Sequence, residues 1–491
     1  MRAGAASLLA TVAVVAAGCG GGGGGGNALP AAADIVPASA PVLISFNTNF
    51  ASPQWKNAFG LLRKFPGAPG LLRRGKRETG IDFERDVKPA LGQEVDVVFL
   101  DFANDGNDVV GLTQPKNKAK LVAVLKKLDA ADDGGSKTFT EDVNGWTVVA
   151  DARSKIDAFR RAAAGDKLAD DGAFKDAMSR LDDKAGVRAY VAGPPVQRAL
   201  DRALERAGGA PNLTRDVARM DSISAAGFVE RGGVRAEAAL TTDPGAEPKT
   251  FNPTLAGSLP AGAYFYLSTA NLGDPTRTIL KLVDRSNPGT KTRVDQLLRV
   301  LGLGLESDVY PLVSGEQALA IYPARPIPTI VFAAKVPNPG RARELVSRIV
   351  QLLQLSGQLT LKTFDVGGTT VYDVSPAGSA THVFVTVAED RLVVTSARNT
   401  LAALVERKGA TLAKDPLYRL ALADAKRPSK VAGLLYADLT HGLPFAFDLA
   451  EANGRVVPPE ARANTQALSH ALLFADQDGD RFRLSGFAAI K

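Results

Sequence analysis

Apolar residues recur along this chain with two spacings, which mark helices and strands. An apolar residue at every third or fourth position predicts an amphipathic helix, whereas alternation with a period of two predicts a half-buried strand. Helical stripes follow Pro115 and Pro337, and residues 36–49 and 259–271 each predict a strand that begins near a proline. The two stripes consist of Leu121, Val122, Val124, Leu125 and Leu128, and of Leu345, Val346, Ile349, Val350 and Leu353.

The pattern occurs twice along the chain. Residues 80–89, GIDFERDVKP, align with residues 302–311, GLGLESDVYP, at a shift of 222. The same shift pairs Pro115 with Pro337, so the helical stripes correspond as well. A long segment that repeats with one offset indicates a duplicated structural unit.

Helix starts fall at the same offset. Ser52 and Pro53 align with Asp274 and Pro275, and in each pair a side-chain oxygen precedes a proline. Such a pair is typical of an N-cap followed by proline in the first helical turn. We therefore expect both pairs to begin helices.

Further along, the two copies differ in length. The shift grows to about 245, which pairs Val148 with Val393. The extra residues of the second copy fall near residues 381–396, THVFVTVAEDRLVVTS, which predict a hairpin that the first copy lacks.

The order of these segments predicts the fold class. Strands joined by hairpins favour an antiparallel sheet over a doubly wound parallel one. We therefore predict an α+β fold, a tandem duplication of a mixed, largely antiparallel sheet-plus-helices domain. The predicted parts are a signal peptide at 1–18, a lipidated cysteine with a glycine-rich tether at 19–35, a first α+β repeat at 36–243, a linker at 244–253 and a second α+β repeat at 254–491.

The N-terminus has the pattern of an export signal. Arg2 precedes an apolar stretch that is too short for a good transmembrane helix. The residues AAGC, from Ala16 to Cys19, resemble the lipobox of bacterial lipoproteins, although the third position before the cysteine usually carries leucine and here is alanine. This resemblance implies a lipid on the Cys19 thiol, and a secreted protein without an anchor is the alternative. The seven glycines that follow are typical of a flexible tether.

Composition limits the classes of function. The 491 residues suffice for two domains, and no apolar run beyond residue 20 is long enough to cross a bilayer. A single cysteine excludes an intramolecular disulfide. With only His382, His441 and His470 beside it, we expect no metal site, and nothing in the sequence predicts a cofactor.

The net charge of +7 indicates which kinds of partner the chain can attract. Outside the cytoplasm we expect no nucleic-acid partner, whereas anionic lipids and acidic wall polymers suit a basic surface. Basic residues cluster between residues 56 and 77, which makes this segment the candidate for a membrane-facing patch; a solvated surface is the alternative. The cluster consists of Lys56, Arg63, Lys64, Arg73, Arg74, Lys76 and Arg77.

Two local motifs suggest ligands, but simpler explanations are favoured. Residues 70–77, GLLRRGKR, are one residue short of a phosphate-binding loop and end in Arg77 where serine or threonine would bind magnesium, so we expect a basic connector rich in turns. The acidic run from Asp101 departs from a calcium loop. Asp105 and Gly106 predict a tight hairpin turn there instead.

Repeated carboxylates invite an acid–base interpretation. Glu84 and Asp86 align with Glu306 and Asp308, two residues apart and close to a proline in each copy. Residues of this kind at a turn are typical caps of the backbone. We therefore predict a structural role for them and assign no catalytic residue.

The opening of the first copy resembles a known family. The segments SPQW at 52–55, FPG at 65–67 and GQE at 92–94 are similar to those of exported bacterial proteins grouped as domain of unknown function 3352. The resemblance covers most of the chain that follows the signal peptide. It implies an exported protein, and the family provides no activity or catalytic residues to transfer.

The expectation for function follows from location and architecture. We expect an extracytoplasmic, lipid-anchored protein with a non-enzymatic binding or scaffolding role at the cell envelope. Its expected partners are membrane lipid, through the anchor, and an envelope protein, polymer or small ligand. The alternatives are a hydrolase of envelope polymers and a carrier of an apolar ligand.

Overall fold

The fold is that of a computed structural model in which two compact units are resolved. The first unit comprises Met1–Glu247, Pro459–Ala467 and Asp478–Lys491, and the second comprises Pro248–Pro458 and Leu468–Gln477. The predicted signal peptide, Cys19 and the glycine run lie outside the described residues. The structure describes residues 29–102, 104, 106–132, 135, 137–206, 220–242, 249–300, 302–355, 359–379, 381–479 and 481–491.

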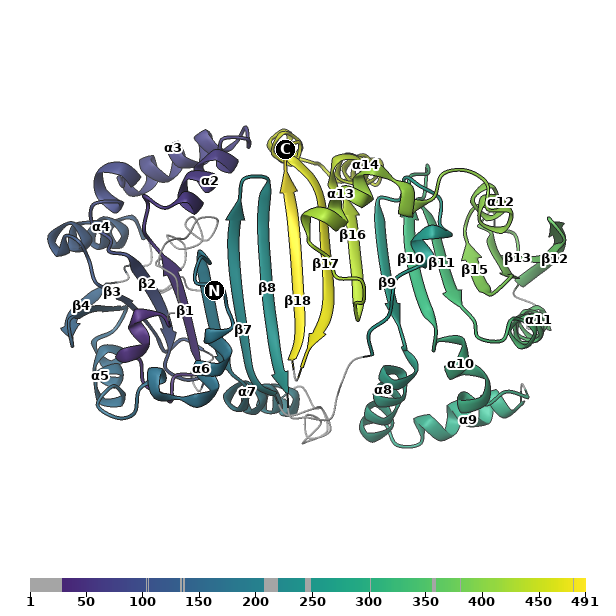
Figure 1. Ribbon diagram of the computed structural model, residues 1–491, viewed down its shortest axis with the longest axis horizontal. Helices are drawn as coiled ribbons and strands as arrows, with labels where there is room; N and C mark the ends of the chain where they lie inside the picture. The colour runs from purple at the N-terminus through teal and green to yellow at the C-terminus, as the bar shows by residue number, and fades with distance from the viewer. Residues whose placement is uncertain are drawn as a thin grey trace. The chain divides into compact units, whose positions relative to one another are not determined.

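The first unit is built on an antiparallel sheet (Figure 1). Its strands are β1 (Val42–Asn47), β2 (Glu94–Phe99), β3 (Val109–Thr113), β4 (Phe139–Val143), β5 (Trp146–Ala150), β6 (Val187–Ala192), β7 (Met220–Glu230), β8 (Gly233–Thr242) and β18 (Arg481–Ile490). They lie in the order β4-β5-β3-β2-β1-β6-β7-β8-β18, and each neighbouring pair is antiparallel.

Helices and short helical turns connect these strands. They are η1 (Ala31–Asp34), α2 (Pro53–Leu62), α3 (Ala68–Thr79), η2 (Phe83–Val87), α4 (Lys118–Ala131), α5 (Arg153–Ala162), η3 (Leu168–Asp170), α6 (Gly172–Ser179), α7 (Gly193–Arg206) and α15 (Pro459–Thr465). The turns η1 and η3 are 3-10 helices, whereas η2 is a single turn of π-helix.

The second unit has its own antiparallel sheet. Its strands are β9 (Phe265–Ala270), β10 (Glu316–Tyr322), β11 (Thr329–Lys335), β12 (Leu359–Val366), β13 (Thr369–Pro376), β14 (Val383–Ala388), β15 (Arg391–Thr395), β16 (Gly433–Asp438) and β17 (Leu468–Asp478). Its helical segments are η5 (Leu255–Gly257), α8 (Gly273–Ser286), α9 (Thr290–Val300), η6 (Leu305–Val309), α10 (Tyr310–Leu312), α11 (Pro339–Leu355), α12 (Arg398–Glu406), η7 (Leu412–Lys414), α13 (Pro416–Asp424) and α14 (Leu439–Ala452).

The pairing of the strands confirms the α+β fold and the tandem duplication. In the first unit β1 pairs with β2 and β6, and β3 pairs with β2 and β5. In the second unit β9 pairs with β10 and β16, and β11 pairs with β10 and β15. Element order and strand neighbours are therefore shared by the two copies. The last strand of the second copy, β18, pairs with β8 and belongs to the first unit.

The extra hairpin of the second copy lies one hairpin earlier than predicted. Residues 381–396 contain β14 and β15, which pair as β4 and β5 do in the first copy. The additional pair is β12 with β13, and β13 continues the sheet beside β14. The prediction at residues 381–396 was wrong because β4, with the sequence FTEDV, has too few apolar residues to be recognised as the counterpart of β14.

One of the two predicted helix starts is confirmed. The side chain of Ser52 accepts a hydrogen bond from the backbone N–H of Trp55 at 3.4 Å, and Pro53 is the first residue of α2. The other prediction was wrong, because α8 begins at Gly273 with Leu272 as its N-cap. Asp274 therefore lies inside the first turn of α8 rather than before it.

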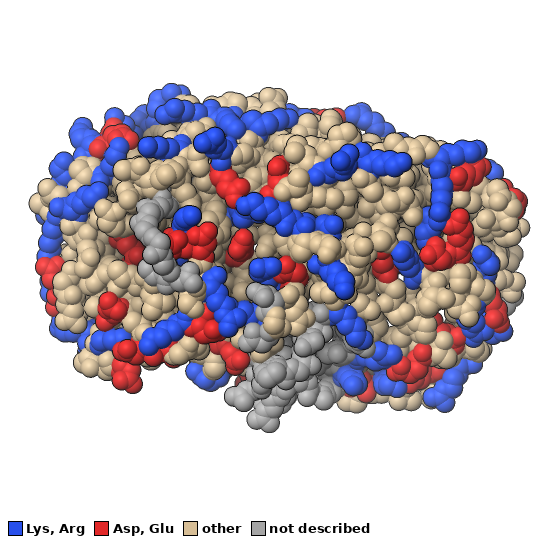
Figure 2. All heavy atoms as spheres, in the orientation of Figure 1, with Lys and Arg blue, Asp and Glu red and all other residues tan. Residues whose placement is uncertain are grey.

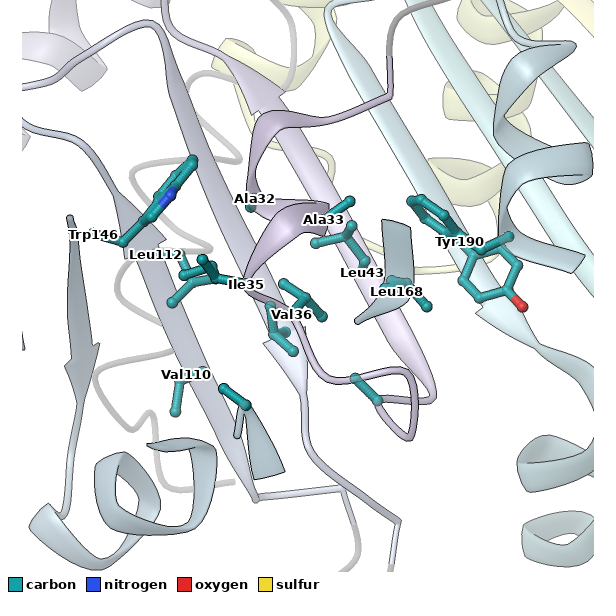
Figure 3. Close-up of a cluster of buried hydrophobic side chains, with 14 of the residues drawn as sticks. Ala32, Ala33, Ile35, Val36, Leu43, Val110, Leu112, Trp146, Leu168 and Tyr190 are labelled. Atoms are coloured by element: carbon teal, nitrogen blue, oxygen red, sulfur yellow. The ribbon is translucent and has the colours of Figure 1, made fainter. Parts of the chain in front are cut away.

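One core cluster of the first unit lies on one face of its sheet. Residues of η1 pack against alternating residues of β1, β3 and β5, and Trp146 belongs to the same cluster. Figure 3 shows Ile35 and Val36, which directly follow η1, near Leu43 and Leu112 of the strands. The period-two pattern of the strands thus places their apolar side chains under a short helical turn.

Candidate functional site

A basic surface on α2 and α3 is the candidate site of the first unit. Residues 56–77 contain no aspartate or glutamate, and every basic residue in this segment is exposed. We call these residues the basic surface: Lys56, Arg63, Lys64, Arg73, Arg74, Lys76 and Arg77. Figure 2 shows basic side chains gathered along the margin of the first unit where Figure 1 places α2 and α3.

Aromatic packing fixes α2 in place. The side chain of Trp55 is 1% exposed, and its indole Nε1 donates a hydrogen bond to the carbonyl oxygen of Asn47 at 3.1 Å. The indole also contacts the rings of Phe50, Phe59 and Phe83, with centroid distances of 4.6, 5.5 and 6.2 Å. Large aromatic side chains dominate core energetics, so this cluster gives the basic surface a rigid support.

The connection between α2 and α3 is held by the C-terminal part of the chain. The Lys64 ammonium donates a hydrogen bond to the carbonyl oxygen of Ile490 at 2.9 Å. The backbone N–H of Gly67 donates to Asn464 Oδ1 at 2.7 Å, and a Cβ at Gly67 would lie only 2.6 Å from the Asn464 amide. A larger residue at Gly67 would therefore displace the Asn464 side chain, because this amide of α15 approaches the backbone closely where α3 begins.

Helix α3 makes little contact with the core. Its only buried residue is Ala68, while Leu71 is 64% and Leu72 is 50% exposed. The helix ends at Gly80, which has a φ of 66°, in the left-handed region that glycine favours. Helix α3 thus presents two adjacent leucines together with four of the basic residues.

The structure also excludes the phosphate-loop interpretation of residues 70–77. All of these residues lie inside α3, whereas a phosphate-binding loop follows a strand and precedes a helix. The predicted turn-rich connector was wrong for the same reason. The sequence indicated the charge of this segment but not its helical conformation.

The acidic run after β2 forms a loop between β2 and β3. The backbone N–H of Leu100 donates to the carbonyl oxygen of Asp108 at 2.8 Å, and Gly106 has a φ of 74°. The connection is thus longer than the tight two-residue turn predicted at Asp105 and Gly106, and Asp105 itself lies outside the described residues. Among the described residues no cluster of three His, Cys, Asp or Glu side chains could hold a metal ion.

The repeated aspartates cap the π-helical turns, as predicted. Asp86 Oδ2 accepts a hydrogen bond from the backbone N–H of Asp82 at 2.9 Å, and Asp308 Oδ2 accepts one from Gly304 at 2.8 Å. Ser307 and the Gly304 N–H, together with Arg341, lower the pKa of Asp308 to about 2. Both carboxylates are therefore ionised and structural.

Their glutamate neighbours have a different role. Glu84 forms an ion pair with Lys88, with 2.9 Å between Nζ and Oε2, and Glu306 forms one with Arg277 at 2.7 Å. These pairs are exposed, and pairs of this kind contribute little to stability. The prediction that the glutamates also cap the backbone was therefore wrong.

A second repeated carboxylate was missed by the sequence analysis. Glu316 is buried and accepts hydrogen bonds from the backbone N–H groups of Thr254 and Leu255, each at 2.9 Å, and from the Ser268 hydroxyl at 3.1 Å. In the first unit Glu94 accepts from the N–H of Ala32 at 3.2 Å. Each glutamate thus ties the short helical turn at the start of its copy to the sheet.

Asp96 is a buried acid in the middle of the first sheet. It is fully buried, lies opposite Ser45 on β1 and Leu112 on β3, and no described donor meets either carboxyl oxygen in hydrogen-bond geometry. Burial, followed by the nearby Glu94 carboxylate, raises the pKa of Asp96 well above its ordinary value. At the aligned position β10 carries Ala318, so the second copy has no counterpart.

The three histidines all lie in the second unit, and two of them are partly exposed. His441 lies in the first turn of α14, and its Nδ1 is 2.7 Å from Oδ2 of the N-cap residue Asp438. His382 Nδ1 is 2.7 Å from Asp373 Oδ1. Each of these imidazoles is oriented by one carboxylate.

The third histidine, His470, lies on β17 and is 1% exposed. Its Nε2 is 3.1 Å from Asp424 Oδ2, and its Nδ1 is 3.2 Å from the hydroxyl of Ser469. Burial lowers the pKa of His470, so the neutral imidazole is favoured.

No helix in the described part of the chain combines the length and apolar character that a membrane crossing requires.

Comparison with known proteins identifies one family. The model of a family described as "Protein of unknown function (DUF3352)" matches residues 2–156 and 152–472. No curated protein matches the chain.

Three crystal forms of TP0453 are among the similar solved structures. Form IV is 14% identical with a TM-score of 0.26, form III is 12% identical with 0.23, and form I is 11% identical with 0.24. They cover 48%, 50% and 49% of this chain and 93%, 96% and 78% of their own. At such TM-scores the likeness carries no conclusion about this chain.

Proposed function

The chain belongs to the family described as "Protein of unknown function (DUF3352)", and from this premise we propose that it is an extracytoplasmic protein, anchored by a lipid on Cys19, with a non-enzymatic binding role at the cell envelope. The observation that carries the proposal is the basic surface, an acid-free segment of exposed arginines and lysines on a rigid support in the first unit. A surface of this kind attracts anionic partners such as lipid headgroups and acidic polymers.

The position of the anchor supports this role. The described part of the first unit begins at Leu29, the tenth residue after Cys19. An extended chain spans at most about 3.5 Å per residue, so a lipidated Cys19 would keep Leu29 within about 35 Å of the membrane. The unit that carries the basic surface is thus the one that the tether would hold beside the envelope.

A hydrolase is the second candidate, and one observation favours it. Ser469, His470 and Asp424 form a hydrogen-bonded series that resembles the order of a serine nucleophile, a base and an orienting acid. The imidazole is 1% exposed, however, which leaves a substrate little access to the base. A serine-directed fluorophosphonate probe that labels the wild type but not Ser469→Ala would favour this candidate.

Anchoring is tested by removing the thiol. Cys19→Ser is expected to move the protein from the membrane fraction to the medium, or to leave an uncleaved precursor, because the lipid would have no attachment point. Fractionation and immunoblotting measure both outcomes. Gly20→Ser, next to the anchor, is the matched control and should fractionate like the wild type; unchanged partitioning and processing of Cys19→Ser would count against the proposal.

A further inference from the structure

We infer that the basic surface docks on the anionic lipid bilayer that holds the anchor, with Leu71 and Leu72 of α3 entering the headgroup layer. This inference rests on the proposed location at the envelope and names the partner of the same site. It makes the first unit a body attached at two places, through the tether and through α3.

The charges of the basic surface are available to a partner. Lys64 donates to the Ile490 carbonyl, and Lys76 forms an exposed ion pair with Asp82 at 2.7 Å. The remaining members form no ion pair with a described residue, and the segment between them holds no acid. These members are Lys56, Arg63, Arg73, Arg74 and Arg77. Juxtamembrane basic residues of this kind are attracted to the negative surface of a bilayer within about one Debye length.

The two leucines favour a bilayer over a soluble polyanion. Leu71 is 64% and Leu72 is 50% exposed. The only buried residue of their helix, α3, is Ala68. A polyanion is recognised by charge alone, whereas a bilayer interface also accepts apolar side chains from a basic helix that lies in its plane. Exposed leucines among arginines therefore fit the headgroup boundary, where arginine stems can reach back to the phosphates.

The anchor and α3 would act together. One acyl chain gives only marginal, reversible membrane binding, and a basic patch is a common second signal. The tether holds the first unit close to the bilayer, so docking of α3 would be favoured by a high local concentration. The aromatic cluster around Trp55 and the contact between Gly67 and Asn464 hold α3 in position for this docking.

The second copy offers a matched control. Its helix α9 aligns with α3 and exposes Lys291, Arg293 and Arg299, but it also contains Asp295, which forms an ion pair with Lys291 at 2.7 Å. Three basic residues can thus be neutralised on either helix with the same change in net charge. Only the change on α3 is expected to affect binding to the bilayer.

The test uses residues 19–491 with Cys19→Ser, so that no acyl chain contributes. Cosedimentation is measured with vesicles of phosphatidylglycerol and phosphatidylcholine in equal amounts, and with vesicles of phosphatidylcholine alone. We expect the protein to bind the anionic vesicles only. Replacing three arginines of α3 by glutamine is expected to weaken this binding about 100-fold, whereas replacing three basic residues of α9 is expected to leave it unchanged. The α3 variant is R73Q/R74Q/R77Q, and the α9 variant is K291Q/R293Q/R299Q.

A second variant separates the bilayer from a polyanion. Leu71→Ser with Leu72→Ser leaves the charge intact and is expected to weaken vesicle binding about tenfold or more, because apolar area no longer enters the interface. If this variant binds vesicles as tightly as the parent chain and soluble polyphosphate competes for the binding, the inference of a bilayer would be overturned and a soluble polyanion would be the partner. Equal binding to both kinds of vesicle, or no binding at all, would also overturn the inference.

This experiment is independent of the anchor. All substituted residues are exposed, so the thermal unfolding of each variant should match that of the parent chain. Suppose that Cys19→Ser moves the protein off the membrane in cells, but the protein binds no vesicles in vitro. These results would support the anchor and contradict the docking surface, and the reverse pair of results would support the docking surface and contradict the anchor.

Discussion

Replacing Trp55 by alanine is expected to lower the free energy of unfolding of the first unit by about 3–5 kcal/mol. The indole is 1% exposed, contacts three phenylalanine rings and donates its N–H to the Asn47 carbonyl, so alanine would leave a cavity and remove this hydrogen bond. Chemical denaturation of the full chain, followed by far-ultraviolet circular dichroism, measures the change.

Leu71→Ala is the control for this substitution. It also removes a large apolar side chain from the α2–α3 region, but from an exposed position, so stability should change by no more than about 0.5 kcal/mol. A loss below about 1 kcal/mol for Trp55→Ala would show that the aromatic cluster does not support the basic surface.

Replacing Asp96 by asparagine is expected to stabilise the first unit by about 1–3 kcal/mol at neutral pH. Burial raises the pKa of Asp96 in the folded state, whereas the unfolded chain titrates near the ordinary value of 3.8. The unfolded state therefore loses its proton first, and the wild type loses stability as the pH rises from about 4 toward the raised pKa. Asparagine does not titrate and removes this loss. Thermal unfolding from about pH 4 to about pH 8 measures the difference.

Asp86→Asn provides a control of opposite sign in the same unit. Hydrogen bonds from Arg85, the Asp82 N–H and Lys127 lower the pKa of Asp86, so its contribution is present above the ordinary value and is lost as the pH falls. Asp86→Asn should thus destabilise the first unit at neutral pH and lose its effect in acid. Equal stability of Asp96→Asn and the wild type at every pH would contradict the raised pKa of the buried Asp96 carboxyl.

The duplication could be predicted from sequence because its landmarks are local. The aligned segments at 80–89 and 302–311 form the same π-helical turn and the same aspartate cap in both copies. The position of the extra hairpin could not be predicted, because β4 is short and polar and gives no period-two signal. The start of α8 at Gly273 was missed because a local N-cap pattern at Asp274 does not decide where a helix begins.

The candidate site was only partly visible in the sequence. Charge is a property of composition, so the basic surface could be found without a structure. The exposure of Leu71 and Leu72 depends on how α3 packs, which the sequence alone does not specify. Glu94 and Glu316 were missed because each accepts hydrogen bonds from backbone groups 61 or 62 residues away, a distance at which no local pattern exists.

The most direct test of the central claim is the covalent state of Cys19 in protein extracted from membranes. Mass spectrometry of the N-terminal peptide is expected to show a chain that begins at Cys19 and carries a lipid on its thiol. A chain that begins at another residue, or an unmodified Cys19 in the membrane-extracted protein, would contradict the account.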